Sequence, residues 1–129
     1  MRLSKSALAL ALVLVLNVVL LISLTPLGFE SRPPTELKTV GYIAIGAVFA
    51  GLILYVASII LLFRRVKLAS ILAIIGSIVL LFPNVADQTG SFFSSPIPPV
   101  INTLEYIFIV VLLVTLFLAS NVYKESEPS

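Results

Sequence analysis

Few side chains in this 129-residue chain are able to do chemistry. The sequence contains no histidine, cysteine or tryptophan, and its single methionine is Met1. Cys/His zinc sites, haem ligation by these residues, disulfides and thiol or imidazole catalysis are therefore excluded. The serines and threonines have no histidine or buried lysine to activate them as nucleophiles. We expect no enzymatic activity, no metal site and no bound cofactor.

Glu105 is the only acidic residue inside a predicted apolar segment, which makes it the first candidate for an ionisable site. Ionisable groups at membrane depth are costly and mark functional sites by default. Tyr42 is expected at a matching depth in another segment, and Lys38 lies one helical turn above it. The sequence therefore predicts a contact of Glu105 with Tyr42 or Lys38. One interpretation is a proton or cation site. The other, favoured because we expect no relay of further buried charges, is a paired or solvated carboxylate at the interface.

An amide, Asn17, lies near the middle of the first apolar segment. A polar side chain in hydrocarbon needs a hydrogen-bond partner. Ser77 and Gly51 are expected at a similar depth in other segments. We therefore predict an interhelical hydrogen bond from Asn17 to Ser77 or to a backbone carbonyl near Gly51. The alternative is that Asn17 binds a substrate in a polar cavity.

The elements that must position these residues are four long apolar segments. Hydrophobic residues make up 60% of the chain and charged residues 11%, whereas soluble domains carry roughly 25% charge. About 20 helical residues, each rising about 1.5 Å, cross a hydrocarbon core about 30 Å thick. The sequence predicts an all-α integral membrane protein, a four-transmembrane-helix bundle forming a single membrane domain, with spans at about 7–24, 39–63, 68–86 and 100–120. The third span is uninterrupted only from Leu68 to Phe82, because Pro83 lies near its end.

The connections between the spans differ in charge. A cytoplasmic link is expected at 64–67, outer loops at 25–38 and 84–99, and a polar tail at 121–129. Six of the eight basic residues fall on the side of the link and the two termini. The positive-inside rule therefore places both termini in the cytoplasm of a multi-pass protein of the plasma (cell) membrane. The two basic residues expected on the outer side are Arg32 and Lys38.

The first apolar segment has a competing interpretation, since a basic start followed by an apolar run also describes a signal peptide. Its apolar run of 18 residues is longer than a typical signal-peptide core. No small-residue cleavage site follows, and Pro26 stands where cleavage would be expected. These features favour an uncleaved helix.

Small residues in the second and third segments suggest close helix packing. Helices in lipid associate through close backbone approach, which small side chains permit. The residues expected to pack, together with Asn17, are Gly46, Ala47, Ala50, Gly51, Ala73, Gly76 and Ser77. The favoured interpretation is that the two segments pack against each other, and the alternative is that the Gly46/Ala50/Ala57 side docks a partner subunit.

A compact basic group lies at the expected cytoplasmic surface. Arg64, Arg65 and Lys67 are candidates for contact with anionic lipid head groups, although their role in setting topology explains them equally well. The net charge of +2 is too small to suggest nucleic acid as a partner. The expected partners are membrane lipids and other integral membrane subunits.

Three functions follow as hypotheses. The favoured one is a small non-catalytic accessory or structural subunit of a larger membrane complex, such as a respiratory, transport or secretion assembly. A second is a small homo-oligomeric transporter or channel in which Glu105 couples to an ion. A weaker third is a lipid-binding or adhesion protein that acts through its proline-rich outer loops.

Overall fold

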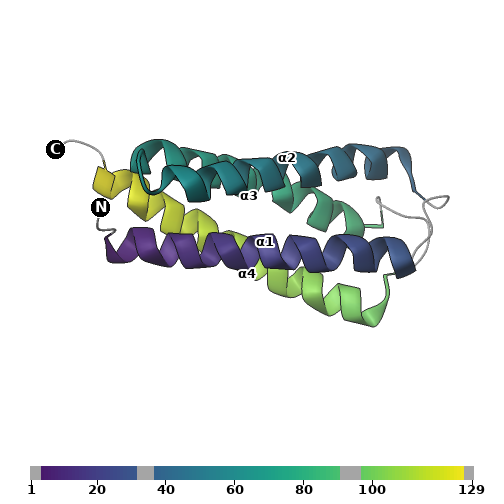
Figure 1. The fold of residues 1–129 in the computed structure, drawn as a ribbon. Coiled ribbons are helices and arrows are strands. Elements are labelled where there is room, and N and C mark those ends of the chain that lie inside the picture. The colour runs from purple at the N-terminus through teal and green to yellow at the C-terminus, as the bar shows by residue number, and fades with distance from the viewer. Residues whose placement is uncertain (1–3, 32–36, 91–96, 127–129) are drawn as a thin grey trace.

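Four long helices follow one another along the chain in the computed structural model, which describes residues 4–31, 37–90 and 97–126 (Figure 1). They are α1 (Lys5–Ser31), α2 (Thr39–Leu61), α3 (Val66–Gln88) and α4 (Pro99–Ser126). Each contains a stretch long and apolar enough to cross a membrane. The predicted all-α four-helix bundle with four candidate spans is confirmed.

The four helices lie side by side and alternate in direction (Figure 1). α2 packs most extensively on α3, α3 on α4, and α4 on α1, while a thinner contact between α1 and α2 closes the ring. α1 and α3 are therefore diagonal across the bundle. The start of α1, the end of α4 and the turn between α2 and α3 lie at one end, which we call the terminal end. The end of α1, the start of α2, the end of α3 and the start of α4 lie at the opposite end, which we call the loop end.

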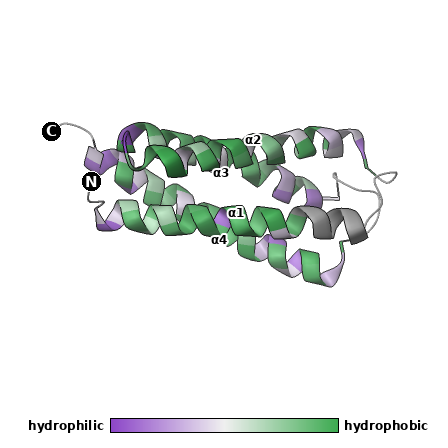
Figure 2. Ribbon diagram, viewed as in Figure 1, coloured by the Kyte–Doolittle hydropathy of each residue, from purple (hydrophilic) through white to green (hydrophobic). Residues whose placement is uncertain are grey.

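The bundle is apolar on its outside and polar in parts of its inside, the reverse of a soluble domain. Figure 2 shows hydrophobic residues along the middle of every helix and hydrophilic ones towards the ends. Large apolar side chains point outward on all four helices, for example Leu12 (66% exposed), Ile53 (68%), Ile78 (58%) and Phe117 (66%). An exposed apolar surface of this extent suits a lipid environment.

α3 is longer than the sequence predicted, because it continues through Pro83 to Gln88. Proline removes one backbone donor from a helix and normally ends or kinks it. Here the Asn84 side chain donates a 2.9 Å hydrogen bond to the Leu80 carbonyl beside the break. The carbonyl that proline itself leaves without a donor is that of Val79, and membrane helices tolerate proline because side chains, neighbouring helices or local backbone adjustments satisfy such groups. The expected outer loop at 84–99 therefore begins inside α3, which ends where Gly90 takes a φ of +77°.

The terminal end is closed by side-chain contacts between the first and last helices. Ser4 caps α1, its Oγ accepting a 3.1 Å bond from the Ala7 amide. Ser6 donates a 2.6 Å bond to one carboxylate oxygen of Glu125, and Ser4 donates a 3.3 Å bond to the other. The carboxylate lies at a helix N-terminus, where the helix dipole favours negative charge. α4 thus extends to Ser126, into the stretch expected to be a polar tail.

One hypothesis from the sequence depends on residues that the structure does not describe. The lipid-binding or adhesion role rests on the outer loops, of which residues 32–36 and 91–96 lie outside the described residues. Arg32, residues 1–3 and residues 127–129 also lie outside the described residues.

Candidate functional site

A layer of buried polar side chains crosses the middle of the bundle, and each helix contributes one of them. The four are Asn17 of α1, Tyr55 of α2, Ser77 of α3 and Thr115 of α4, all with no exposed surface. Asn17, Ser77 and Thr115 each lie eleven or twelve residues from the helix end at the terminal end. At about 1.5 Å per residue this is about 16–18 Å, or half of a bilayer core. We call these four residues the polar layer.

The first link of the polar layer joins α1 to α4. The Asn17 Nδ2 group donates a 2.8 Å hydrogen bond to Thr115 Oγ1. Thr115 Oγ1 in turn donates a 2.7 Å bond to the carbonyl of Val111, one turn earlier in its own helix. The Thr115 hydroxyl is therefore an acceptor and a donor at once. Asn17 was predicted to bond with Ser77 or a carbonyl near Gly51. Its partner is Thr115 because α1 packs on α4 and is diagonal to α3.

The second link of the polar layer joins α2 to α3. The Tyr55 hydroxyl and Ser77 Oγ are 2.5 Å apart, and either oxygen can be the donor. The Tyr55 hydroxyl is also close enough to the Thr115 side chain to interact with it. Tyr55 thus connects the two hydrogen-bonded pairs, and all four helices meet in one polar cluster.

Sequence reasoning missed Tyr55, because its backbone does not lie at the depth of Ser77. Tyr55 is six residues from the end of α2, whereas Ser77 is eleven residues from the start of α3. Helical side chains lean towards the helix N-terminus, which in α2 points away from the α2–α3 turn. The long tyrosine side chain therefore carries its hydroxyl towards the middle of the bundle. The sequence feature that could have identified Tyr55 is a tyrosine well inside an apolar segment.

The small residues of α2 and α3 divide into two sets. A Cβ at Gly51 would overlap the Leu80 side chain, and one at Gly76 would stand 3.0 Å from the Tyr55 ring. Ala73 is buried with them. Gly46 and Ala50 instead face outward, Ala47 is half-buried, and a Cβ at Gly46 would meet nothing within 4 Å. The expected packing face thus consists of inner residues around Gly51 and Gly76, with Gly46 and Ala50 outside it.

Glu105 is buried near the loop end, with a partner that the sequence did not predict. It is 8% exposed, and its Oε1 accepts a 2.8 Å hydrogen bond from Gln88 Nε2 of α3. Lys38 donates to the Gly90 carbonyl at 2.7 Å, and Tyr42 is 65% exposed. α3 supplies the partner of Glu105 because α4 packs on α3, while Tyr42 and Lys38 belong to the diagonal helix α2 and its cap.

Asp87 is a second buried carboxylate at this end. It was expected in an outer loop, but the extended α3 holds it with only 2% of its surface exposed. Asp87 precedes Gln88, the residue that bonds with Glu105. The loop end of the α3–α4 interface therefore carries more buried charge than the sequence indicated.

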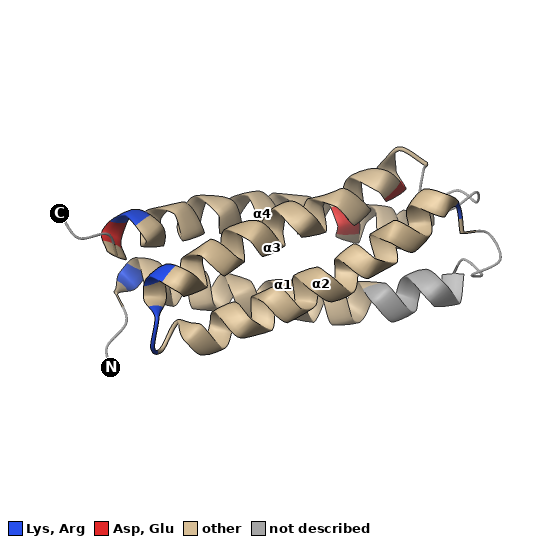
Figure 3. Cartoon of the chain, turned by 90° about the horizontal axis from the view of Figure 1, so that it is seen from above, with Lys and Arg blue, Asp and Glu red and all other residues tan. Residues whose placement is uncertain are grey.

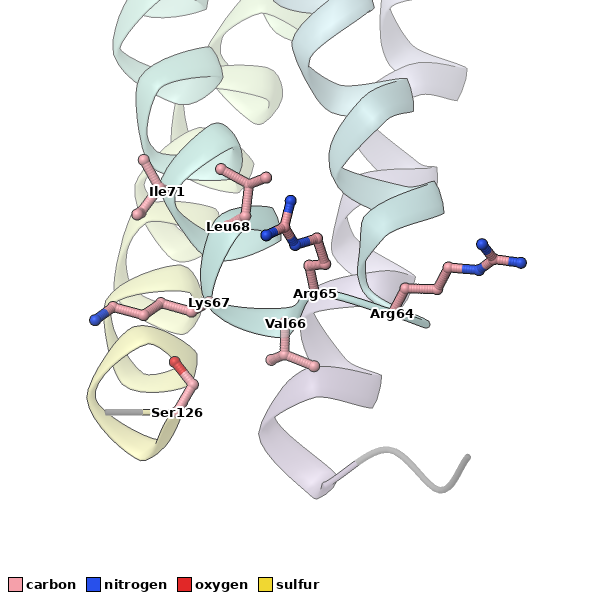
Figure 4. Close-up of a pocket in the computed structure, with 7 residues that line it drawn as sticks. All are labelled: Arg64, Arg65, Val66, Lys67, Leu68, Ile71 and Ser126. Atoms are coloured by element: carbon pink, nitrogen blue, oxygen red, sulfur yellow. The ribbon is translucent and has the colours of Figure 1, made fainter. Parts of the chain in front are cut away.

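The basic residues at the terminal end surround an open hollow at the start of α3 (Figure 4). Arg64 and Lys67 extend away from each other, and the Lys67 Nζ lies 5.2 Å from the centre of the Tyr123 ring. Figure 3 shows Lys and Arg side by side at this end of the molecule. Because Arg64, Arg65 and Lys67 do not converge on one point, their arrangement suits separate surface contacts better than a single chelated group.

The polar layer contains only neutral hydroxyl and amide groups, which exchange hydrogen bonds without carrying charge. Among the described residues, no group of three His, Cys, Asp or Glu side chains is placed to hold a metal ion. Comparison with protein families, with characterised proteins and with solved structures finds no match to this chain.

Proposed function

We propose that this chain is a small, non-catalytic accessory or structural subunit of a larger membrane complex, such as a respiratory, transport or secretion assembly. The observation that carries the proposal is the outward face of α2. Its residues follow alternating spacings of three and four, and they are Ile43, Gly46, Ala50, Ile53, Ala57 and Ile60. Three of them are isoleucines exposed by 61–68%, and the small residues lie between them. We call this set the α2 stripe.

The α2 stripe has the pattern by which helices pack in lipid. Spacings of three and four keep residues on one side of a helix that crosses its neighbour at a small angle. Gly46 and Ala50 permit the backbone of a second helix to come close, and the isoleucines lie on either side of these small residues along the helix. Within its own bundle α2 uses the other side, around Gly51, Tyr55 and Ser58. The α2 stripe is therefore available to a helix of another subunit.

The orientation that we propose follows from charge. The described basic residues at the terminal end are Lys5, Arg64, Arg65, Lys67 and Lys124, whereas Lys38 is at the loop end. The positive-inside rule then places both termini in the cytoplasm. In this orientation Arg64, Arg65 and Lys67 contact the head groups of anionic lipids in the inner leaflet, each contributing about 1 kcal/mol. We propose that the chain is located in the plasma membrane.

The experiment that tests the accessory role is extraction of native membranes in a mild detergent, followed by sizing and mass spectrometry of what migrates with the tagged chain. We expect stoichiometric comigration with larger membrane subunits. The double variant Gly46→Leu/Ala50→Leu fills the α2 stripe and should release the chain from them. The matched control Val110→Phe adds bulk on the exposed face of α4 and should leave the complex intact. Migration of the wild-type chain only with copies of itself would contradict the proposal.

One observation favours a second candidate, a small transporter or channel that uses Glu105. The structure buries both Glu105 and Asp87 near the loop end, one more carboxylate than the sequence suggested. Buried carboxylates are a feature of proton and cation pathways. Proton flux into proteoliposomes containing the purified chain tests this function, with Glu105→Gln as the variant. Flux that depends on Glu105 in the absence of other subunits would favour transport over the accessory role.

A further inference from the structure

Asn17 leaves one atom of the polar layer without a partner. Its Oδ1 is buried and accepts no hydrogen bond from any residue that the structure describes. It is the one buried side-chain nitrogen or oxygen atom of the described residues in this condition. A buried acceptor that has lost its water and gained no donor destabilises a fold, so native structures pair such atoms with protein groups or ordered water.

The hydroxyl groups of the polar layer do not supply the missing donor. Thr115 has a single hydroxyl proton, which it gives to the Val111 carbonyl. Tyr55 and Ser77 share one hydrogen bond, and the Tyr55 hydroxyl also lies close to Thr115, so neither of these hydroxyls donates to Asn17. Turning the Asn17 amide by half a rotation would exchange its oxygen and nitrogen, but one half of the amide would still face no partner. The layer thus holds one unsatisfied acceptor, the Asn17 Oδ1 atom.

We propose that the polar layer is a binding site for one ordered water molecule, which donates a hydrogen bond to Asn17 Oδ1. The second hydrogen of the same water is available to a hydroxyl oxygen of the polar layer, since each hydroxyl oxygen has two lone pairs. Buried waters in proteins are held in this way, by two to four polar groups that would otherwise be unsatisfied.

The chemistry of the polar layer selects water over other occupants. All four of its side chains are neutral, whereas hard cations require several oxygen ligands, usually including carboxylates. The four side chains are also completely buried, so an occupant must be small. Water is a small, neutral molecule that can donate to the amide oxygen and also to a hydroxyl oxygen. This inference does not depend on the proposed accessory role, since it concerns the interior of the bundle.

The test is an NMR measurement of dipolar contacts between water and the full-length protein in nanodiscs, with labelled asparagine amides and labelled methyl groups. We expect a water contact at the Asn17 side-chain amide and at the Thr115 methyl group. The Leu10 methyls, buried two turns away on α1, should show none. Absence of contact at Asn17 would overturn the proposal. Contact at both Asn17 and Leu10 would also overturn it, because it would reveal a continuous water path instead of one bound molecule.

Two variants assign the water to Asn17. Asn17→Leu should remove the contact at the Thr115 methyl group, because the acceptor is gone. Thr115→Val should keep the contact at the Asn17 amide, because Oδ1 is still present. A contact at Thr115 that survives in Asn17→Leu would show that other groups hold the water, and would refute the role of Asn17. If Asn17→Leu does not fold, the wild-type measurement and Thr115→Val decide the question alone.

Discussion

The Asn17 side-chain amide of α1 donates a 2.8 Å hydrogen bond to the Thr115 hydroxyl of α4, across 98 residues of sequence. This bond joins the first and last helices at the centre of the bundle. Lipid tails are as apolar as the helix surfaces, so apolar burial contributes little to helix association in a membrane. Close packing and interhelical hydrogen bonds decide which helices pair, and this bond lies between two helices that no short loop connects.

Thr115→Val should destabilise the bundle by about 1–2 kcal/mol, because it leaves the buried Asn17 amide without its acceptor. Unfolding in mixed detergent micelles measures the change. The double variant Asn17→Leu/Thr115→Val removes both polar groups and should recover part of the loss. A double-mutant cycle should give a coupling of about 0.6–1.7 kcal/mol. Strictly additive effects of the two substitutions would show that the bond contributes nothing.

Tyr55→Phe should cost about 0.6–2 kcal/mol of stability, since it removes the hydroxyl that joins Ser77 to the rest of the polar layer. The same unfolding measurement applies. Tyr106→Phe is the matched control, because Tyr106 is 57% exposed. Removing its hydroxyl should change stability by less than about 0.5 kcal/mol. Equal effects of the two substitutions would mean that the Tyr55 hydroxyl is not stabilising.

Alanine should be tolerated at Gly46 and harmful at Gly51. A Cβ at Gly51 overlaps the Leu80 side chain and forces α2 and α3 apart, at a cost of about 1–3 kcal/mol. A Cβ at Gly46 meets nothing, and alanine is the better helix former by about 0.5–1 kcal/mol. Comparing the two variants by thermal unfolding in detergent checks the expectation. Similar stabilities for both would indicate that Leu80 moves aside freely.

Glu125→Gln should loosen the first turn of α1. The carboxylate accepts hydrogen bonds from Ser4 and Ser6 at the positive end of the helix dipole. We expect faster hydrogen exchange at the amide of Ala7 and its neighbours, with little change at the centre of α1. The loss of stability should be modest and smaller at high salt, because the contact is exposed and screened. Unchanged exchange at Ala7 would show that the contact does not hold the helix end.

Part of the polar layer was predictable and part was not. Asn17 stood out because an amide inside an apolar segment must have a partner, and this rule needs only the sequence. Its partner could not be predicted, because Ser77 and Thr115 lie at equal depth and only helix adjacency separates them. Asp87 was assigned to a loop because proline usually ends a helix, whereas α3 continues through Pro83 to Gln88.

The sequence also did not show which face of α2 points into the bundle and which points outward. A helix in lipid is apolar all around, so its hydrophobic pattern does not show which side meets the protein. Small residues occur on both sides of α2, at Gly51 facing Leu80 and at Gly46 facing outward. Periodicity separated these two sides, but it did not indicate which of them α3 would cover.

The amino-acid sequence by itself determined the four apolar helices and the basic link between the second and third. Hydropathy, span length and the distribution of Lys and Arg are local properties that can be counted along a chain. The tertiary structure alone decided which helices are neighbours, and therefore that Asn17 bonds with Thr115, Tyr55 with Ser77 and Glu105 with Gln88. The physical reason is that helix adjacency follows from close packing around residues such as Gly51 and Gly76, which depends on side chains that are distant in sequence.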